Sequence, residues 1–163
     1  MNIHEGDSVM HWTHGLGKVV QLEERALSGQ AVLYYAIQIG DMTVWVPADE
    51  QLESRLRLPT QAAKFKKLMN TLSQPGEPLP DDRRERKTVL TEWLKDGRTE
   101  SLFRVIRSLV TYRQGHSLNL DEQTLLKRSK NALIGEWGYA MSLTPAQAES
   151  ELYRLLGPAP LGV

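Results

Sequence analysis

The sequence predicts an α+β protein in which a small, strongly bent β-barrel precedes an all-α domain of about five helices. Residues 1–58 alternate at period two between turn signals, whereas the apolar residues after Pro59 recur at helical spacing. The charge changes at the same place: residues 1–58 hold four Lys/Arg and eight Asp/Glu, and residues 59–163 hold sixteen and twelve. We therefore expect two domains, 1–58 and 59–163, with different surfaces and partners.

The N-terminal domain is predicted to consist of four or five short strands. Gly-containing pairs at Ser28-Gly29 and Gly40-Asp41 mark turns, because glycine tolerates positive φ. Pro47 cannot donate to a strand ladder and is expected to end a strand. The expected strands are Ser8–Trp12, Lys18–Arg25, Ala31–Ile39 and Met42–Val46. So many short strands in fewer than 60 residues indicate a barrel of the SH3 or Tudor type.

The C-terminal domain shows the signals of helices and of the loops between them. The first helix carries an apolar stripe at i, i+3, i+4 and i+7, and a proline-rich loop, Gln74–Pro80, follows it. The stripe consists of Phe65, Leu68, Met69 and Leu72. The next helices are expected at Asp81–Lys95, from a cap at Thr99, from Asn119 to about Met141, and from Thr144 to just before Gly157.

The composition excludes several classes of protein. Hydrophobic residues make up 40% and charged residues 25%, which is ordinary for a soluble folded protein. The chain has no cysteine, which excludes disulfides, thiolate metal cages and a thiol nucleophile. No basic-then-apolar leader and no run of about 18 apolar residues is present, so we expect a soluble cytoplasmic protein.

No pattern in the sequence marks a catalytic, metal or cofactor site. His11 and His14 are three apart in an expected strand and turn, where that spacing does not place both on one face. The segment Gly15-Leu16-Gly17-Lys18 lacks the earlier glycine and the following helix of a phosphate-binding loop. No carboxylate pair is spaced as a general acid and base. We predict a protein that is not an enzyme and that binds no cofactor, metal or small-molecule substrate.

The strongest local charge feature opens the helix after the proline-rich loop. Four cations in five residues oppose the helix macrodipole there, so local helix stability does not explain them. Contact with phosphates is one interpretation, and a solvated helix face is the other. Lys127, Arg128 and Lys130 form a second basic group. The residues we expect to bind DNA are Arg83, Arg84, Arg86, Lys87, Lys127 and Lys130.

Trp45 is a candidate contact residue on the β domain. In a strand it alternates with Val44 and Val46, so if the valines face the core, the indole lies on the outer face. An exposed Trp on an edge strand indicates a protein contact. The alternative is that Trp45 packs in the core and the valines face outward. Trp93 and Trp137 fall within apolar helical stripes and are expected in the core.

Several short segments, in a fixed order, carry a resemblance to a known family. In the first domain they are Glu5–Val9, His14–Gly17, Tyr34-Tyr35 and Asp41–Pro47. In the second they are Pro78–Pro80, Arg86, Asp96-Gly97 and Leu125–Glu136, which includes Leu133-Ile134-Gly135-Glu136. Taken in order, these segments resemble the CarD/CdnL family of bacterial transcription regulators that bind RNA polymerase. The N-terminal domain is also similar to the polymerase-interaction domain of transcription-repair coupling factors, although no helicase follows.

The resemblance implies a Tudor-like domain that binds the polymerase β subunit and a helical domain that touches promoter DNA upstream of the melted region. Together these contacts stabilise the open promoter complex in such proteins. Arg25 matches a family position that contacts the β subunit, and Trp45 stands where relatives commonly carry a basic residue. We therefore expect Arg25 and Trp45 to bind RNA polymerase.

One position departs from the pattern that the resemblance implies. Relatives place a Trp three residues after the proline-rich loop, where it wedges into the minor groove, and this chain has Arg83 there. An Arg can enter a narrow minor groove but cannot wedge a base step as an aromatic ring does. The alternative function is therefore a protein-interaction adaptor whose helical domain binds a protein and not DNA.

Overall fold

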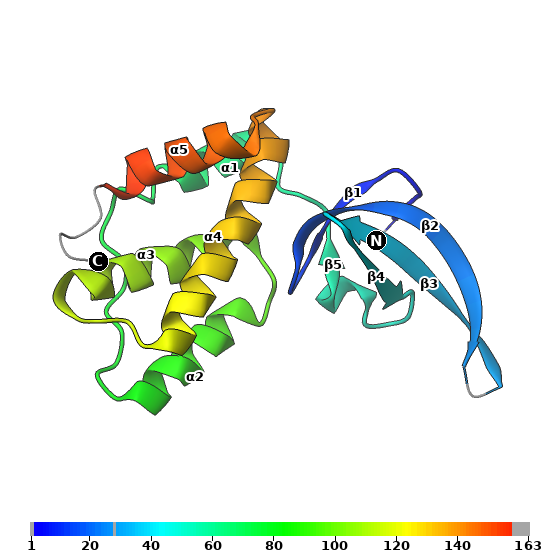
Figure 1. Ribbon diagram of the computed structural model, residues 1–163, viewed down its shortest axis with the longest axis horizontal. Coiled ribbons are helices and arrows are strands. Elements are labelled where there is room, and N and C mark those ends of the chain that lie inside the picture. The colour runs from blue at the N-terminus through cyan, green and yellow to red at the C-terminus, as the bar shows by residue number, and fades with distance from the viewer. Residues whose placement is uncertain (1, 28, 158–163) are drawn as a thin grey trace. The chain divides into compact units, whose positions relative to one another are not determined.

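The computed structural model describes residues 2–27 and 29–157 and divides into two compact units, Met1–Pro59 (unit 1) and Thr60–Val163 (unit 2). Figure 1 shows strands in the first and helices in the second. This confirms the predicted α+β class, a bent antiparallel sheet followed by a helical domain. None of the helices in the described part of the chain is long and apolar enough to cross a membrane.

Unit 1 is a five-stranded antiparallel sheet in the order β4-β3-β2-β1-β5. A 3-10 turn, Leu52–Ser54, precedes the last strand. The expected strands are present with small shifts: Trp12 lies beyond β1, and Pro47 is the last residue of β4. Gly29 has a φ of +81° at the expected turn, where Ser28 lies outside the described residues. The strands are β1 Ser8–His11, β2 Gly15–Leu27, β3 Gln30–Ile39, β4 Met42–Pro47 and β5 Leu56–Arg57.

The core of unit 1 lies on one face of this bent sheet. Val9, Val19, Ile37 and Val46 are at most 2% exposed and pack together. The strands approach closely at Gly17, where an added Cβ would lie 2.6 Å from the side chain of Ile37. The β2–β3 pairing has a register shift between Val19 and Gln21, beyond which the two strands stay paired as far as Leu27 and Gln30.

His11 stabilises the turn after β1. It is buried, and its Nδ1 accepts hydrogen bonds from the backbone N–H groups of Thr13 (3.1 Å) and His14 (3.2 Å). Burial, and then the neighbouring His14, lowers the pKa of His11 to about 4. The imidazole is therefore neutral near pH 7 and acts as a hydrogen-bond acceptor for the turn.

Unit 2 consists of five helices, and the two strongest cap signals in the sequence are confirmed. Asn119 and Glu122 form a capping box at the start of α4, and Thr144 and Gln147 form one at α5. The cap expected at Thr99 is wrong, because Arg98 is the N-cap residue of α3 and Thr99 is buried in the first turn. The helices are α1 Ala62–Met69, α2 Arg83–Leu94, α3 Thr99–Gly115, α4 Leu120–Met141 and α5 Pro145–Leu156.

An aromatic cluster and one buried carboxylate mark the centre of unit 2. The rings of Phe65 and Trp137 meet edge to face, with centroids 5.5 Å apart, and the expected burial of Trp137 is confirmed. Glu136, which is fully buried, accepts hydrogen bonds from the backbone N–H of Thr60 (2.8 Å) and the Thr99 hydroxyl. These bonds tie the first residues of unit 2 to α3 and α4.

The loop between α1 and α2 contacts the backbone of α3 directly at Gly76. Its N–H donates to the Thr111 hydroxyl (2.8 Å), and an added Cβ would lie 2.4 Å from the backbone carbon of Arg107 and nitrogen of Ser108. Backbone atoms of a helix cannot move aside as a flexible side chain can. Only glycine therefore fits here, and this contact fixes the path of the loop toward α2.

We predict that Gly76→Ala lowers the free energy of unfolding by roughly 1–3 kcal/mol, the usual cost of overpacking, because the methyl group meets the α3 backbone. The measurement is chemical denaturation of the full-length chain. Gly115→Ala is the matched control, since a Cβ there meets nothing within 4 Å. Equal effects of the two substitutions would show that the loop does not pack against α3 at this point.

Candidate functional site

The first candidate surface is a stacked pair on the outer face of the sheet in unit 1. The guanidinium carbon of Arg25, on β2, lies 3.9 Å from the ring centroid of Trp45, on the edge strand β4. Val44 and Val46 face the core, so the indole lies on the outer face as predicted, where it is half-buried and not fully exposed. Arg25 also lies 3.8 Å from a carboxylate oxygen of Glu23. The pair presents a cation and a large apolar ring together.

Cross-strand register explains how residues from two separate strands meet. Trp45 lies opposite Ala36, whose small side chain is only 1% exposed beneath it. Arg25 lies opposite Val32, farther along β3, and its long side chain reaches back over β3 to the indole. Such a contact contributes about 0.5–1 kcal/mol at an exposed site, so it favours the stacked arrangement before any partner binds.

The second candidate surface is a groove between α2 and α4 in unit 2. It has a volume of about 340 Å³, and Arg83, Lys87 and Arg128 line it. Arg83 and Lys87 are one turn apart on α2, and Arg128 projects from α4. All three are exposed, and none has an ion-pair partner in the described part of the chain. Two acidic residues also line the groove: Glu122, which is paired with Arg86, and Asp121, which is not paired with an arginine among the described residues.

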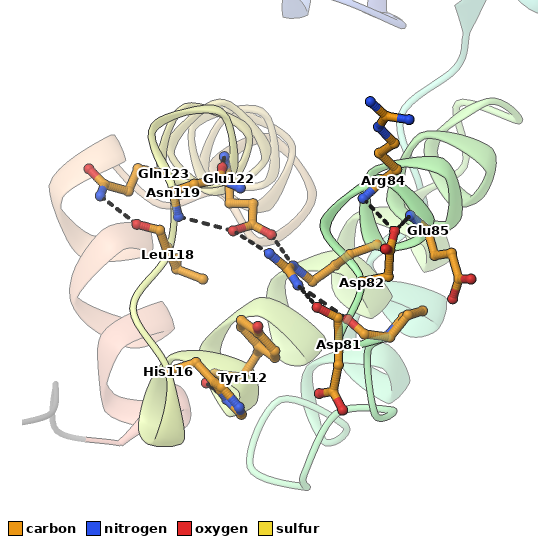
Figure 2. Close-up of polar contacts among 12 residues, drawn as sticks. Asp81, Asp82, Arg84, Glu85, Tyr112, His116, Leu118, Asn119, Glu122 and Gln123 are labelled. Atoms are coloured by element: carbon orange, nitrogen blue, oxygen red, sulfur yellow. Dashed lines mark hydrogen bonds and ion pairs between the residues drawn. The ribbon is translucent and has the colours of Figure 1, made fainter.

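Asp82 is the N-cap residue of α2 and stabilises its cationic first turn. Its side chain accepts hydrogen bonds from the backbone N–H groups of Arg84 (2.9 Å) and Glu85 (3.0 Å), which caps the helix. In Figure 2 the side chain of Arg84 points away from the polar cluster around Glu122. Arg84 is an exposed cation that does not line the groove.

Arg86, in contrast, lies inside the protein, and the surface placement expected for it is wrong. Its side chain is 7% exposed and forms an ion pair with Glu122, which is also 7% exposed. The same guanidinium donates to the backbone carbonyls of Pro80 (3.2 Å) and Asp81 (3.1 Å) and lies over the ring of Tyr112. Glu122 in turn accepts from the Asn119 N–H at 3.0 Å (Figure 2). The hydrogen bond to Glu122 raises the pKa of Arg86, so the guanidinium keeps its charge despite its burial.

The spacing of residues along α2 and α4 is the sequence signal that could have predicted this ion pair. Arg86 precedes Leu90 by one turn and therefore lies on the same inward stripe. Glu122 likewise precedes the buried Leu126 and Leu133 on α4. A cation and an anion on two facing apolar stripes predict a buried pair, whereas residue type alone predicts surface charge.

The members of the second basic group, Lys127, Arg128 and Lys130, lie on two different sides of α4. Arg128, which was not among the residues expected to bind DNA, joins Arg83 and Lys87 in the groove. Lys127 and Lys130 lie elsewhere and line a cavity toward α3 and α5. Residues two apart on a helix point to nearly opposite sides, which explains the separation of Arg128 from Lys130.

Comparison with known proteins agrees with this arrangement. Residues 3–61 match the model of the CarD-like/TRCF RID domain, and residues 67–153 match that of the CarD C-terminal domain. This chain belongs to the CarD-like family. It is 28% identical over 151 residues to a Bacillus subtilis (strain 168) protein named "Putative transcription factor YdeB", a match that covers 89% of this chain and 96% of that protein. Membership of the CarD-like family gives the chain a transcription-related role that involves RNA polymerase.

Arg83 stands where a wedging tryptophan was expected, and the aromatic residue nearest to it in the sequence, Trp93, is not free to replace that tryptophan. Trp93, expected in the core, is half-buried, and the guanidinium carbon of Arg104 lies 3.9 Å from its ring centroid. Arg104 is itself held by Glu77 of the proline-rich loop at 2.8 Å. Among the described residues, no aromatic ring lines the groove between α2 and α4, which therefore offers a partner charge and hydrogen-bond donors.

We predict that Arg86→Met lowers the free energy of unfolding by about 3–5 kcal/mol, because it leaves the Glu122 carboxylate buried without its cation. Arg86→Met/Glu122→Gln should recover part of this loss, since glutamine keeps the cap of α4 without a buried charge. Chemical denaturation measures both. Arg84→Met, at an exposed position, is the control and should change stability by less than about 0.5 kcal/mol.

The same set of variants tests the role of Arg86 in binding. Arg86→Met with unchanged stability and weakened DNA binding would contradict the structural role of the pair and would restore Arg86 to the groove.

Proposed function

We propose that this chain is a non-enzymatic transcription regulator that binds the β subunit of RNA polymerase through unit 1 and promoter DNA through unit 2, and so modulates the stability of the open complex. The observation that carries the proposal is the pairing of Arg25 with Trp45 on the exposed face of a domain that matches the CarD-like/TRCF RID model. The groove between α2 and α4 supports the second half.

The Arg25–Trp45 pair has the properties of an interface anchor. Trp and Arg are enriched among the residues that carry most of the binding energy at protein interfaces. The indole offers apolar area, and the guanidinium above it keeps donors free for a carboxylate on the partner. Because the two side chains are already stacked, little conformational entropy is lost on binding.

The groove of Arg83, Lys87 and Arg128 fits the sugar-phosphate backbone of DNA. The unpaired cations from two helices gain from replacing the counterions around a phosphate. Arg84, which is exposed on α2 beside Arg83, adds to the basic surface of that helix. Contacts of this kind hold DNA and carry no direct base information, so unit 2 would bind any sequence that the polymerase places beside it.

The decision between DNA and a protein partner for unit 2 depends on the groove. A protein partner would need an apolar anchor or a matching acidic patch, whereas three cations without an aromatic ring favour a phosphate backbone.

For unit 1 we predict that Arg25→Glu and Trp45→Ala each weaken binding to the isolated β subunit by about 30-fold, or about 2 kcal/mol, because each removes half of the stacked anchor. Biolayer interferometry measures the affinity, and circular dichroism checks the fold. Arg57→Glu on β5, at the opposite edge of the sheet from β4, is the control and should bind normally. Normal affinity of both anchor variants would remove this surface from the proposal.

For unit 2 we predict that Arg83→Gln, Lys87→Gln and Arg128→Gln each reduce the slope of log K against log salt by roughly 0.9, since each removes one phosphate contact. The loss should be similar for different duplex sequences and for a pre-melted bubble. Fluorescence anisotropy across a salt series measures it, with Lys95→Gln at the other end of α2 as the control.

The triple variant decides between the two candidate functions. It should shorten the lifetime of open complexes on the polymerase, because it keeps the unit 1 anchor and removes the groove cations. If open complexes live as long as with the unaltered chain, the groove does not hold DNA, and unit 2 binds a protein partner.

A further inference from the structure

A second cavity in unit 2 is independent of both proposed surfaces. It has a volume of about 840 Å³ and lies between the end of α3, the loop that follows it, α4 and α5. This volume is within the range of about 300–1,000 Å³ that is typical of small-molecule sites. The charged and aromatic residues of its lining are Arg113, His116, Lys127, Lys130, Glu149 and Tyr153.

The lining gathers positive charge that the protein itself does not neutralise. Arg113, Lys127 and Lys130 face the cavity with one carboxylate, Glu149, and none of the three cations forms an ion pair among the described residues. The Nε of Arg113 is buried without a hydrogen-bond partner there. This atom is shielded from the cavity as well as unpaired, so a ligand there would meet the terminal nitrogens of the guanidinium.

Lys130 lies in a partly buried and positively charged environment. It is half-buried, and its Nζ lies 4.9 Å from the ring centroid of Tyr153 on α5. Burial, followed by repulsion from Arg113, lowers the pKa of Lys130, and Glu149 opposes this only in part. An anion in the cavity would relieve the repulsion between the two cations and replace the lost hydration of the ammonium group.

The cavity does not continue the DNA groove. Lys127 and Lys130 are three residues apart and share one side of α4, whereas Arg128 lies on the side that faces α2. A DNA backbone that follows Arg83, Lys87 and Arg128 would therefore run along the other side of this helix.

We propose that the cavity between α3, α4 and α5 binds a small phosphate-bearing anion of nucleotide size. Arg113 supplies a planar fork that can hold two phosphate oxygens, and Lys130 supplies a point charge beside it. Tyr153, which is 47% exposed, provides an aromatic wall against which a base can pack. The volume is several times that of one phosphate group, which favours a nucleotide. This proposal does not rest on the proposed function.

The test is calorimetric titration of the full-length chain at fixed ionic strength and near neutral pH with two probes, inorganic pyrophosphate and ATP. We expect saturable one-to-one binding of both, with ATP the tighter because its base uses the rest of the cavity. Arg113→Gln and Lys130→Gln should each weaken binding by about 10-fold or more, the usual effect of losing a hydrogen bond to a charged group. Arg128→Gln, on the other side of α4, is the matched control and should bind the probes normally.

A second variant and a second readout keep the result interpretable. Lys127 is exposed, so Lys127→Gln should leave the fold intact and still weaken binding. ATP should raise the melting temperature of the unaltered chain and have less effect on Arg113→Gln, because a ligand stabilises only the state that binds it.

Three results would overturn the proposal. The first is the absence of saturable binding of either probe. The second is an equal loss in Arg128→Gln, which would show nonspecific attraction to a basic surface. The third is a loss of duplex DNA binding in Arg113→Gln and Lys130→Gln with unchanged probe binding, which would make the cavity a DNA backbone contact.

Discussion

The Arg86–Glu122 ion pair is the interaction on which the arrangement of unit 2 depends. It joins α2 to α4, and the same guanidinium holds the end of the proline-rich loop through the carbonyls of Pro80 and Asp81. The ring of Tyr112, on α3, lies against the Arg86 guanidinium. The same ring is stacked on that of His116, with centroids 4.2 Å apart. These contacts hold α2 against α4, α3 and the proline-rich loop, so Arg83 and Lys87 on its exposed face keep a fixed position relative to Arg128. The buried ion pair therefore positions the three exposed cations of the groove.

Local signals in the sequence predicted much of this fold, and non-local contacts account for the rest. The capping boxes at Asn119 and Thr144 and the alternation around Trp45 depend on neighbouring residues only, and the structure has them as predicted. The cap at Thr99 was wrong because its hydroxyl bonds to Glu136, far away in the sequence. Arg86 was misplaced because its partner belongs to another helix. Helical spacing did hold the information that both members of the pair lie on inward stripes.

The angular position of each cation on its helix decides what it can do. In the sequence, Lys127, Arg128 and Lys130 form one basic group, and the rotation of α4 between them sends Arg128 to the groove and the two lysines to the cavity. The groove has a volume of about 340 Å³, and its cations come from α2 and α4. The cavity has a volume of about 840 Å³ and gathers Arg113, Lys127 and Lys130. In the two proposals, similar charge therefore serves two kinds of phosphate ligand, distinguished by the volume and lining of their sites.

The proposed function explains why a groove without an aromatic wedge is sufficient. A few phosphate contacts alone give nonspecific dissociation constants of roughly 10⁻⁴–10⁻⁶ M, too weak to select a promoter among other DNA. Once unit 1 is bound to the polymerase, the DNA beside it reaches an effective concentration on the order of millimolar, which is enough to fill such a site. In this proposal the Arg25–Trp45 anchor determines where the protein acts. The groove cations would determine how long DNA stays there, since phosphate contacts act on any sequence that the polymerase presents.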